Sequence, residues 1–339
     1  MRRKLATGYS LIEVLVAISV LGLLMALVLP AVQSARGQAR RIACANNLRQ
    51  VGVALSAYHD ANGTFPQYIT NIRSARGLRW VGHEQYFSPH VRLLPYLDQV
   101  QLYSGVNFTF EFPPVATTQP PPENSTAYGA TISVFLCPSD GSHCGLDHGN
   151  NYRCNVGVGP SWSTAAESPD SGNGFFSFPY QPSAASFPDG LSHTVAFSER
   201  LRGSGEQLPI TEEQRGAIRR DLSRDYGDLS FYRRSAERDA DTALEWCRVA
   251  AQQHFPAYTQ AGNNWFYSGR EITGYTHAQE PNGAIPDALN MYFVTSFGVS
   301  TARSNHRGGV NAVMGDGSVR FVTGGVDRAV WRALGSRNG

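Results

Sequence analysis

Two histidines and two carboxylates in the C-terminal half of the chain are the residue types that could do acid–base chemistry. His306 and Asp316 stand ten residues apart, and His193 and Glu199 precede them in a separate segment. A histidine close to a carboxylate can transfer a proton or bind a metal ion. The sequence contains neither a G-x-S-x-G nucleophile elbow nor an H-E-x-x-H zinc motif. We therefore expect these residues to support the fold, and we expect the protein not to be an enzyme.

The residues around Asp316 predict a β-hairpin. The sequence Gly-Asp-Gly-Ser at 315–318 separates two short apolar runs, residues 310–314 and 319–322. An Asp-Gly pair between such runs is a strong hairpin signal, and Gly317 is expected to need a positive φ. Asp316 is expected to accept hydrogen bonds within its own turn.

His306 is expected to hydrogen-bond a loop in front of this hairpin. Asp327 is expected to cap a short final helix. No cofactor or metal site is expected. Calcium is an alternative, but Asp316 and Asn311 fall short of the six to eight oxygens that calcium takes.

Five cysteines, at positions 44, 137, 144, 154 and 247, could form disulfides if most of the chain lies outside the cytoplasm. The pairings we favour are Cys44 with Cys137, tying a helix to a domain, and Cys144 with Cys154, closing a short loop. Cys247 is the expected free thiol, because the number is odd. Zinc is the alternative for Cys137, Cys144, His148 and Cys154, although their spacing matches no standard zinc motif.

The N-terminus predicts a membrane-spanning helix with one ionisable residue. Residues 8–29 are mostly apolar and follow the basic stretch Arg2-Arg3-Lys4. A hydrocarbon core of about 30 Å needs roughly 20 helical residues, so this run is long enough to span it. Glu13 lies inside the run, and an ionisable side chain in a membrane segment is a functional candidate.

The rest of the chain predicts an α+β fold. Small and apolar residues recur every three or four positions over residues 32–58, which predicts a helix ending near the breaker residues 62–66. A second helix is expected over 89–103, bent or split by Pro95, with strands over 131–136 and 193–198. Residues 206–248 hold ten acids and eight arginines, which predicts a solvated helical insertion.

Composition excludes some partners. The 339-residue chain has a formal charge of +2, and loss of the first eight residues, with three basic side chains, would leave about −1. This balance argues against nucleic acid as a partner.

The N-terminal residues resemble the signal of type IV pilins and type II secretion pseudopilins. The resemblance implies that a prepilin peptidase cleaves between Gly8 and Tyr9 and methylates the new amine of Tyr9. It also implies that Glu13 pairs with that amine on a neighbouring subunit during assembly, and that Pro30 bends the helix. A plain anchor helix with Glu13 reaching the interface is the alternative.

Further segments resemble a large domain of unknown function found in prepilin-type proteins. They include PAVQSARGQARRIACANNLRQVGVAL from position 30, FLCPSD from 135, DGLSHTVAFSE from 189, and an H-X9-DG signature formed by His306, Asp316 and Gly317. The implied organisation is a leader over 1–8, a transmembrane and assembly helix over 9–32, its amphipathic continuation over 33–62, and an extracytoplasmic domain over 63–339. That domain is expected to be β-rich and mostly antiparallel, and its hairpin and final helix occupy 306–334.

Two functions follow as hypotheses. The first is a pseudopilin-like structural subunit of the inner membrane, whose partners are the prepilin peptidase, other pilin-like subunits and the secretion or pilus machinery. The second is a membrane-anchored module that binds a glycan or small solute through aromatic side chains such as Trp80, Trp162, Trp265 and Tyr267.

Overall fold

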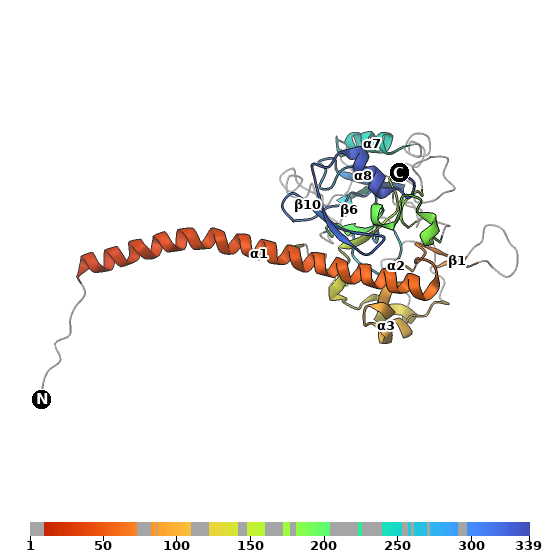
Figure 1. The fold of residues 1–339 in the computed structure, drawn as a ribbon, viewed down its shortest axis with the longest axis horizontal. Helices are drawn as coiled ribbons and strands as arrows, with labels where there is room; N and C mark the ends of the chain where they lie inside the picture. Colours follow the sequence, from red (N-terminus) through yellow and green to blue (C-terminus); the bar gives the residue numbers. More distant parts are fainter. Residues whose placement is uncertain are drawn as a thin grey trace, which may run out of the picture. The chain divides into compact units, whose positions relative to one another are not determined.

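The computed structural model divides into two compact units, Met1–Ile42 and Ala43–Gly339, whose elements are drawn in Figure 1. It describes residues 10–72, 83–85, 87–109, 122–141, 148–159, 172–176, 181–203, 223–225, 239–252, 257–258, 261–269, 272–290 and 297–339. Gly8, Tyr9, Cys144, Trp80 and Trp162 lie outside these ranges, as does most of the charged segment between residues 204 and 238.

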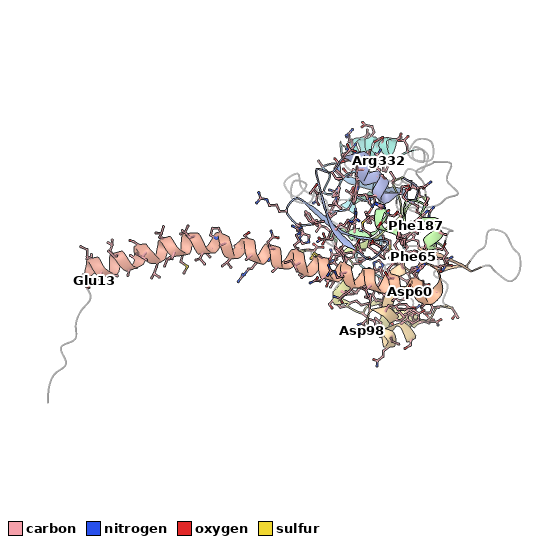
Figure 2. The ribbon with its side chains drawn as sticks, viewed as in Figure 1. Glu13, Asp60, Phe65, Asp98, Phe187 and Arg332 are labelled. Atoms are coloured by element: carbon pink, nitrogen blue, oxygen red, sulfur yellow. A yellow bond between two sulfur atoms is a disulfide. The ribbon has the colours of Figure 1, made fainter. Side chains whose placement is uncertain are left out.

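Helix α1, Leu11–Asn62, supplies the described part of the first unit. Ser10 and Glu13 form a reciprocal cap at its start, in which Ser10 N donates to Glu13 Oε2 at 2.8 Å and Glu13 N donates to Ser10 Oγ at 3.2 Å. Figure 2 marks Glu13 in this first turn. Every residue from position 10 to position 36 is exposed, and the helix is long and apolar enough to cross a membrane. Pro30 lies inside it.

The last third of α1 belongs to the second unit and buries one face in it. The buried residues are Cys44, Leu48, Val51, Gly52, Ala54 and Leu55. Gly63 ends the helix with a positive φ of 71°, and its N–H donates to His59 O at 2.7 Å. A glycine just past the last turn is the common way to satisfy terminal carbonyls. The predicted end of the helix is thus confirmed.

A five-stranded sheet forms the centre of the second unit, in the order β11-β10-β4-β3-β7. The strands are β3 (Tyr152–Asn155), β4 (Val195–Glu199), β7 (Gly274–Tyr275), β10 (Gly309–Met314) and β11 (Val319–Thr323). All neighbours pair antiparallel except β3 and β7. The predicted hairpin is confirmed, since β10 and β11 pair from Gly309 with Thr323 to Val313 with Val319.

The other sheets are smaller. A four-stranded sheet has the order β6-β5-β8-β9, with β5 (Ser223–Asp225), β6 (Ala257–Tyr258), β8 (Asp287–Asn290) and β9 (Phe297–Val299). Strands β1 (Thr70–Ile72) and β2 (His83–Gln85) pair alone. Together with the helices, these sheets make the α+β fold that the sequence predicted.

The helices of the second unit are mostly short. They are α2 (Pro89–Leu93), α3 (Val100–Ser104), α4 (Ser125–Tyr128), α7 (Ala240–Gln252), α8 (Arg328–Gly335), and the 3-10 turns η1 (Leu94–Tyr96), η2 (Pro122–Asn124), η3 (Ser133–Phe135), η4 (Ala184–Ser186) and η5 (Leu191–His193). Asp327 caps α8, because its Oδ1 accepts from Ala329 N at 2.8 Å and from Val330 N at 3.2 Å.

Two sequence predictions need correction. The strand expected over 131–136 is wrong, because the segment closes into η3, where Phe135 N donates to Ile132 O at 2.9 Å. An apolar run this short can bury Phe135 from a turn as well as from a strand. The helix expected over 89–103 is split as predicted, into α2, η1 and α3, because Pro95 in η1 cannot donate a helical hydrogen bond. The charged insertion is helical at α7, but it also contains β5.

Aromatic side chains fill the core into which α1 buries one face. Phe65 contacts Phe175 with a centroid separation of 4.9 Å and Phe187 with one of 5.9 Å, and Figure 2 labels Phe65 and Phe187. Trp265 is fully buried and Tyr267 is 8% exposed. Both therefore belong to the core, and neither lines a surface site for a glycan.

The turn of the β10–β11 hairpin lies directly against α1. A Cβ on Gly52 would stand 2.7 Å from Val313 Cγ2 and 2.9 Å from Gly317 O, while Gly317 has a φ of +82°. Only glycine lets the helix and the turn approach this closely, and only glycine adopts that φ without strain.

We predict that Gly52→Ala destabilises the second unit by about 1–3 kcal/mol, the usual cost of overpacking, although alanine is the better helix former. Gly37→Ala is the matched control, because Gly37 lies in the same helix with no neighbour within 4 Å of an added Cβ. That control should leave stability equal or slightly higher. Denaturant unfolding of the detergent-solubilised chain measures both, and equal midpoints for the two variants would contradict the close approach.

Candidate functional site

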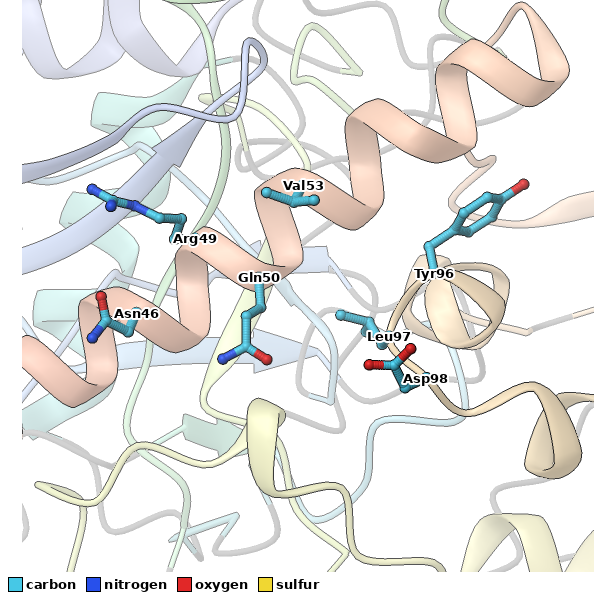
Figure 3. A pocket seen from close by; sticks show the side chains of 7 residues that line it. All are labelled: Asn46, Arg49, Gln50, Val53, Tyr96, Leu97 and Asp98. Atoms are coloured by element: carbon cyan, nitrogen blue, oxygen red, sulfur yellow. The ribbon is translucent and has the colours of Figure 1, made fainter.

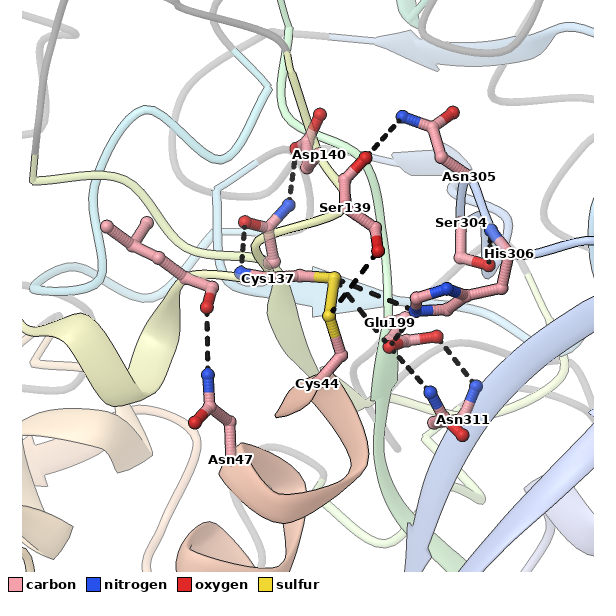
Figure 4. The surroundings of a disulfide bond; sticks show 12 residues. Cys44, Asn47, Cys137, Ser139, Asp140, Glu199, Ser304, Asn305, His306 and Asn311 are labelled. Atoms are coloured by element: carbon pink, nitrogen blue, oxygen red, sulfur yellow. Dashed lines mark hydrogen bonds and ion pairs between the residues drawn. A yellow bond between two sulfur atoms is a disulfide. The ribbon is translucent and has the colours of Figure 1, made fainter. Parts of the chain in front are cut away.

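A disulfide joins α1 to the segment that follows η3. Cys44 and Cys137 are 93 residues apart in the sequence and their Cα atoms lie 5.0 Å apart (Figure 4). Cys44 is fully buried and Cys137 is 7% exposed. This is one of the two pairings that we favoured from the sequence. Asn47, one turn after Cys44, adds a hydrogen bond from its Nδ2 to Leu136 O at 2.9 Å.

A buried histidine–carboxylate pair lies beside this disulfide. His306 Nε2 is 3.0 Å from Glu199 Oε1, and the two side chains are each 2% exposed. An ionised carboxylate only accepts, so the imidazole donates. Asn311 of β10 donates to the same carboxylate from its backbone N at 2.7 Å and from its Nδ2 at 2.9 Å. Three donors thus fix the Glu199 carboxylate at the end of β4.

The disulfide and the histidine–carboxylate pair are one cluster. Cys137 Sγ lies 3.7 Å from His306 Nε2 and 4.0 Å from Glu199 Oε1. One ligand-type atom from each of Cys44, Cys137, Glu199 and His306 lies within 4.8 Å of all the others (Figure 4). We call these four residues the Cys–Glu–His cluster.

Polar side chains around the Cys–Glu–His cluster hold its loops in place. Asn151 Oδ1 accepts from Cys137 N at 3.0 Å, Asn305 Nδ2 donates to Ser139 O at 3.0 Å, and Ser304 Oγ accepts from His306 N at 3.1 Å. These contacts fix the loop after η3 and the loop before β10. The cluster is therefore the meeting point of α1, β4 and two loops.

The four candidate acid–base residues do not assemble into one site. His306 and Glu199 meet, and the partner of His306 is this carboxylate, not a loop. Asp316 is exposed, and its Oδ1 accepts from Ser318 N at 2.9 Å and from Ser318 Oγ at 2.7 Å, within its own turn. His193 is exposed as well, with its Nδ1 2.9 Å from Asp189 O.

The pairing of Cys144 with Cys154 stays a prediction, because Cys144 lies outside the described residues. Cys154 is fully buried in β3, where it pairs with Phe197 of β4 and Gly274 of β7. Within the described residues it is a free thiol, and burial raises its pKa well above the usual value. The glycine- and asparagine-rich stretch before it suggested a loop cysteine. The chain in fact enters the middle of the sheet at Tyr152.

Sequence reasoning missed two polar features. The first is the cap formed by Ser10, although the S-x-x-E spacing of Ser10 and Glu13 is its known signature. The second is the fully buried Asp287 of β8, which forms ion pairs with Arg200 and, at 3.1 Å, with Arg303. Burial alone raises the pKa of Asp287, but Arg303 and Arg200 outweigh it, so the pKa is lowered. No local motif marks this carboxylate, because its partners are distant in the sequence.

Surface grooves offer less to chemistry than the cluster does. One groove of about 520 Å³ is lined by Asn46, Arg49, Gln50, Val53, Tyr96, Leu97 and Asp98 (Figure 3). It lies between the polar face of α1 and η1. Its lining includes a single aromatic side chain, Tyr96, and two charged ones, Arg49 and Asp98.

Comparison with known proteins identifies the family. A model described as "Protein of unknown function (DUF1559)" matches residues 33–329. The chain belongs to this DUF1559 family. A second model, the "Prokaryotic N-terminal methylation motif", matches residues 3–29. The combination of a prepilin-type N-terminus with a large domain of unknown function is thereby confirmed.

The DUF1559 chain is also similar to the "Type II secretion system core protein G" of Pseudomonas aeruginosa. The two are 35% identical over 66 residues, which is 20% of this chain and 46% of the relative. The chain thus spans about half the length of that curated relative. No solved structure matches the chain.

We predict that His306→Ala lowers the unfolding free energy by about 1–3 kcal/mol, because it removes a buried hydrogen bond and leaves the carboxylate of Glu199 with one donor fewer. His193→Ala, at an exposed position, is the control and should stay within about 0.5 kcal/mol of wild type. Denaturant unfolding compares the two under oxidising conditions. If His306→Ala unfolded at the midpoint of His193→Ala, the pair would not stabilise the domain.

Proposed function

We propose that the protein is a structural, pilin-like subunit of a type II secretion or type IV pilus-like assembly, without catalytic activity of its own. The observation that carries this proposal is the first part of α1. It is an exposed apolar segment that coincides with the matched N-terminal methylation motif. The similarity to a type II secretion protein supports the same reading.

The apolar side chains of this segment are unfavourable in water and favour contact with lipid or with another protein. Leucine, isoleucine and valine side chains between positions 11 and 29 are at least half exposed, for example Leu11 at 82% and Leu23 at 64%. Continuous apolar surface of this extent marks a membrane or protein contact. The same helix can lie in a bilayer as an anchor and pack against other subunits in a filament.

Glu13 is the group through which assembly would be directed. Its Oε2 accepts from Ser10 N in the helix cap, and a carboxylate can accept further bonds. Cleavage after Gly8 by a prepilin peptidase would place a methylated amine on Tyr9, one residue before the cap. The amine of a neighbouring subunit would compensate the charge of Glu13 in an apolar contact.

The Cys44–Cys137 disulfide supports a position of the second unit outside the cytoplasm, because disulfides persist in oxidising compartments. The proposed location is therefore the inner membrane, with one membrane pass and an extracytoplasmic domain. Partners would be the peptidase, other pilin-like subunits and the secretion or pilus machinery.

We predict that Gly8→Val blocks removal of the leader when the gene is expressed together with a prepilin peptidase, because the peptidase must approach the backbone closely at a residue without a side chain. Gly22→Val, in the same apolar segment, is the control and should be processed normally. Intact-mass analysis of the membrane fraction distinguishes the two. A wild-type chain that keeps Met1 in the presence of the peptidase would contradict the proposal.

A second prediction separates the charge of Glu13 from its role as a cap. Glu13→Gln removes the charge but keeps a hydrogen-bond acceptor at N3, the third residue of the helix. Ser10→Ala removes the hydroxyl and keeps the charge. Glu13→Gln should insert into the membrane normally and lose most crosslinked oligomers. Ser10→Ala should keep them. If Ser10→Ala abolished crosslinking and Glu13→Gln did not, helix capping would be the function of Glu13.

A further inference from the structure

The Cys–Glu–His cluster holds four metal-ligating side chains in a closed, buried site. We propose that, once the disulfide is reduced, Cys44, Cys137, His306 and Glu199 bind one divalent zinc-type cation. The disulfide and the metal would be alternative ways to make the same connection between α1 and the sheet.

The separations between ligand atoms fit such a cation. With zinc–sulfur bonds of about 2.3 Å and zinc–nitrogen or zinc–oxygen bonds of about 2.0–2.1 Å, tetrahedral geometry puts sulfur about 3.6 Å from nitrogen and nitrogen about 3.3 Å from oxygen. The observed separations are 3.7 Å from Cys137 Sγ to His306 Nε2 and 3.0 Å from that nitrogen to Glu199 Oε1. The bonded sulfurs must separate to about 3.8 Å, and Cys137 Sγ, which lies 4.0 Å from Glu199 Oε1, must approach that oxygen to about 3.6 Å.

The surroundings of the ligands favour a structural metal site. Asn311 donates two hydrogen bonds to the Glu199 carboxylate and orients it, while Asn151 holds the backbone N–H of Cys137. Such outer contacts fix ligand direction in metal centres. Four protein ligands with no open position are typical of structural zinc, not catalytic zinc. Asn305, which is exposed and bonded to Ser139, lies at the edge of the cluster (Figure 4).

Reduction of the disulfide and binding of the cation balance in electrons and protons. A dithiol or phosphine reductant supplies two electrons, and the disulfide takes up two protons to give two thiols. Binding the cation then releases both thiol protons. His306 donates from Nε2 to Glu199 in the disulfide form, so its proton must move to Nδ1 before Nε2 can bind the cation; Glu199 binds as the carboxylate. A disulfide sulfur is no thiolate, so the oxidised cluster should not hold the ion.

The test uses the full chain in detergent, without a polyhistidine tag, stripped of metal and prepared in oxidised and phosphine-reduced forms. Each form is incubated with zinc alone and desalted, and its zinc is measured by mass spectrometry. The reduced chain should hold about one zinc, at least tenfold more than the oxidised chain. Cobalt should give the visible absorption of a tetrahedral thiolate complex in the reduced form only.

Variants locate the ion. Cys44→Ser with Cys137→Ser should abolish the retained zinc, and His306→Gln should weaken zinc binding at least tenfold. Cys154→Ser, at a buried thiol in β3, is the matched control and should retain zinc. The proposal is overturned if the reduced wild type holds no more zinc than the oxidised form, or if the double variant holds as much as wild type. The comparison of the two redox forms needs no variant, so it decides the matter even if the double variant does not fold.

Discussion

The burial of one face of α1 between Cys44 and Leu55 sets the positions of the other elements of the second unit. Close approach at Gly52 brings the turn of the β10–β11 hairpin onto the helix. About two turns earlier, Cys44 is bonded to Cys137 and brings in the loop after η3. A helix fixed at two points along one face cannot slide or rotate. The hairpin and that loop are therefore held at a defined distance from each other. Glu199 lies where they meet.

The disulfide and the Glu199 carboxylate stabilise this arrangement in different ways. Closing a loop of 93 residues with a disulfide destabilises the unfolded chain by about 4–5 kcal/mol in the chain-entropy description. The Glu199 carboxylate instead demands donors in the folded state, because an unpaired buried charge is strongly unfavourable. His306 supplies one donor from the loop before β10, and Asn311 supplies the others from β10 itself. The disulfide thus limits how far the segments can separate, while the carboxylate selects the arrangement in which they meet.

Local patterns in the sequence predicted the elements whose causes are local. The hairpin around Asp316, the cap at Asp327 and the end of α1 near Gly63 each depend on a few adjacent residues, and each appears in the structure. The strand expected over 131–136 failed because a short apolar run does not distinguish a strand from a buried turn.

The Cys–Glu–His cluster was only partly predictable, because its members come from four distant segments. Cys44 and Cys137 could be paired from the sequence, and His306 and Glu199 were considered together as candidates. Nothing in the sequence placed the disulfide beside the histidine, and Asp316 competed as its partner. The resemblance to a domain family did mark all four stretches, and the structure supplies a physical reason for the association: each stretch contributes one side chain to the same buried contact.

For a subunit proposed to assemble through α1, this contact has a mechanical consequence. A load on the helix within the second unit passes through the Cys44–Cys137 bond to the loop after η3, which Asn151 and Asn305 hold by hydrogen bonds, so the helix cannot be withdrawn without breaking a covalent bond.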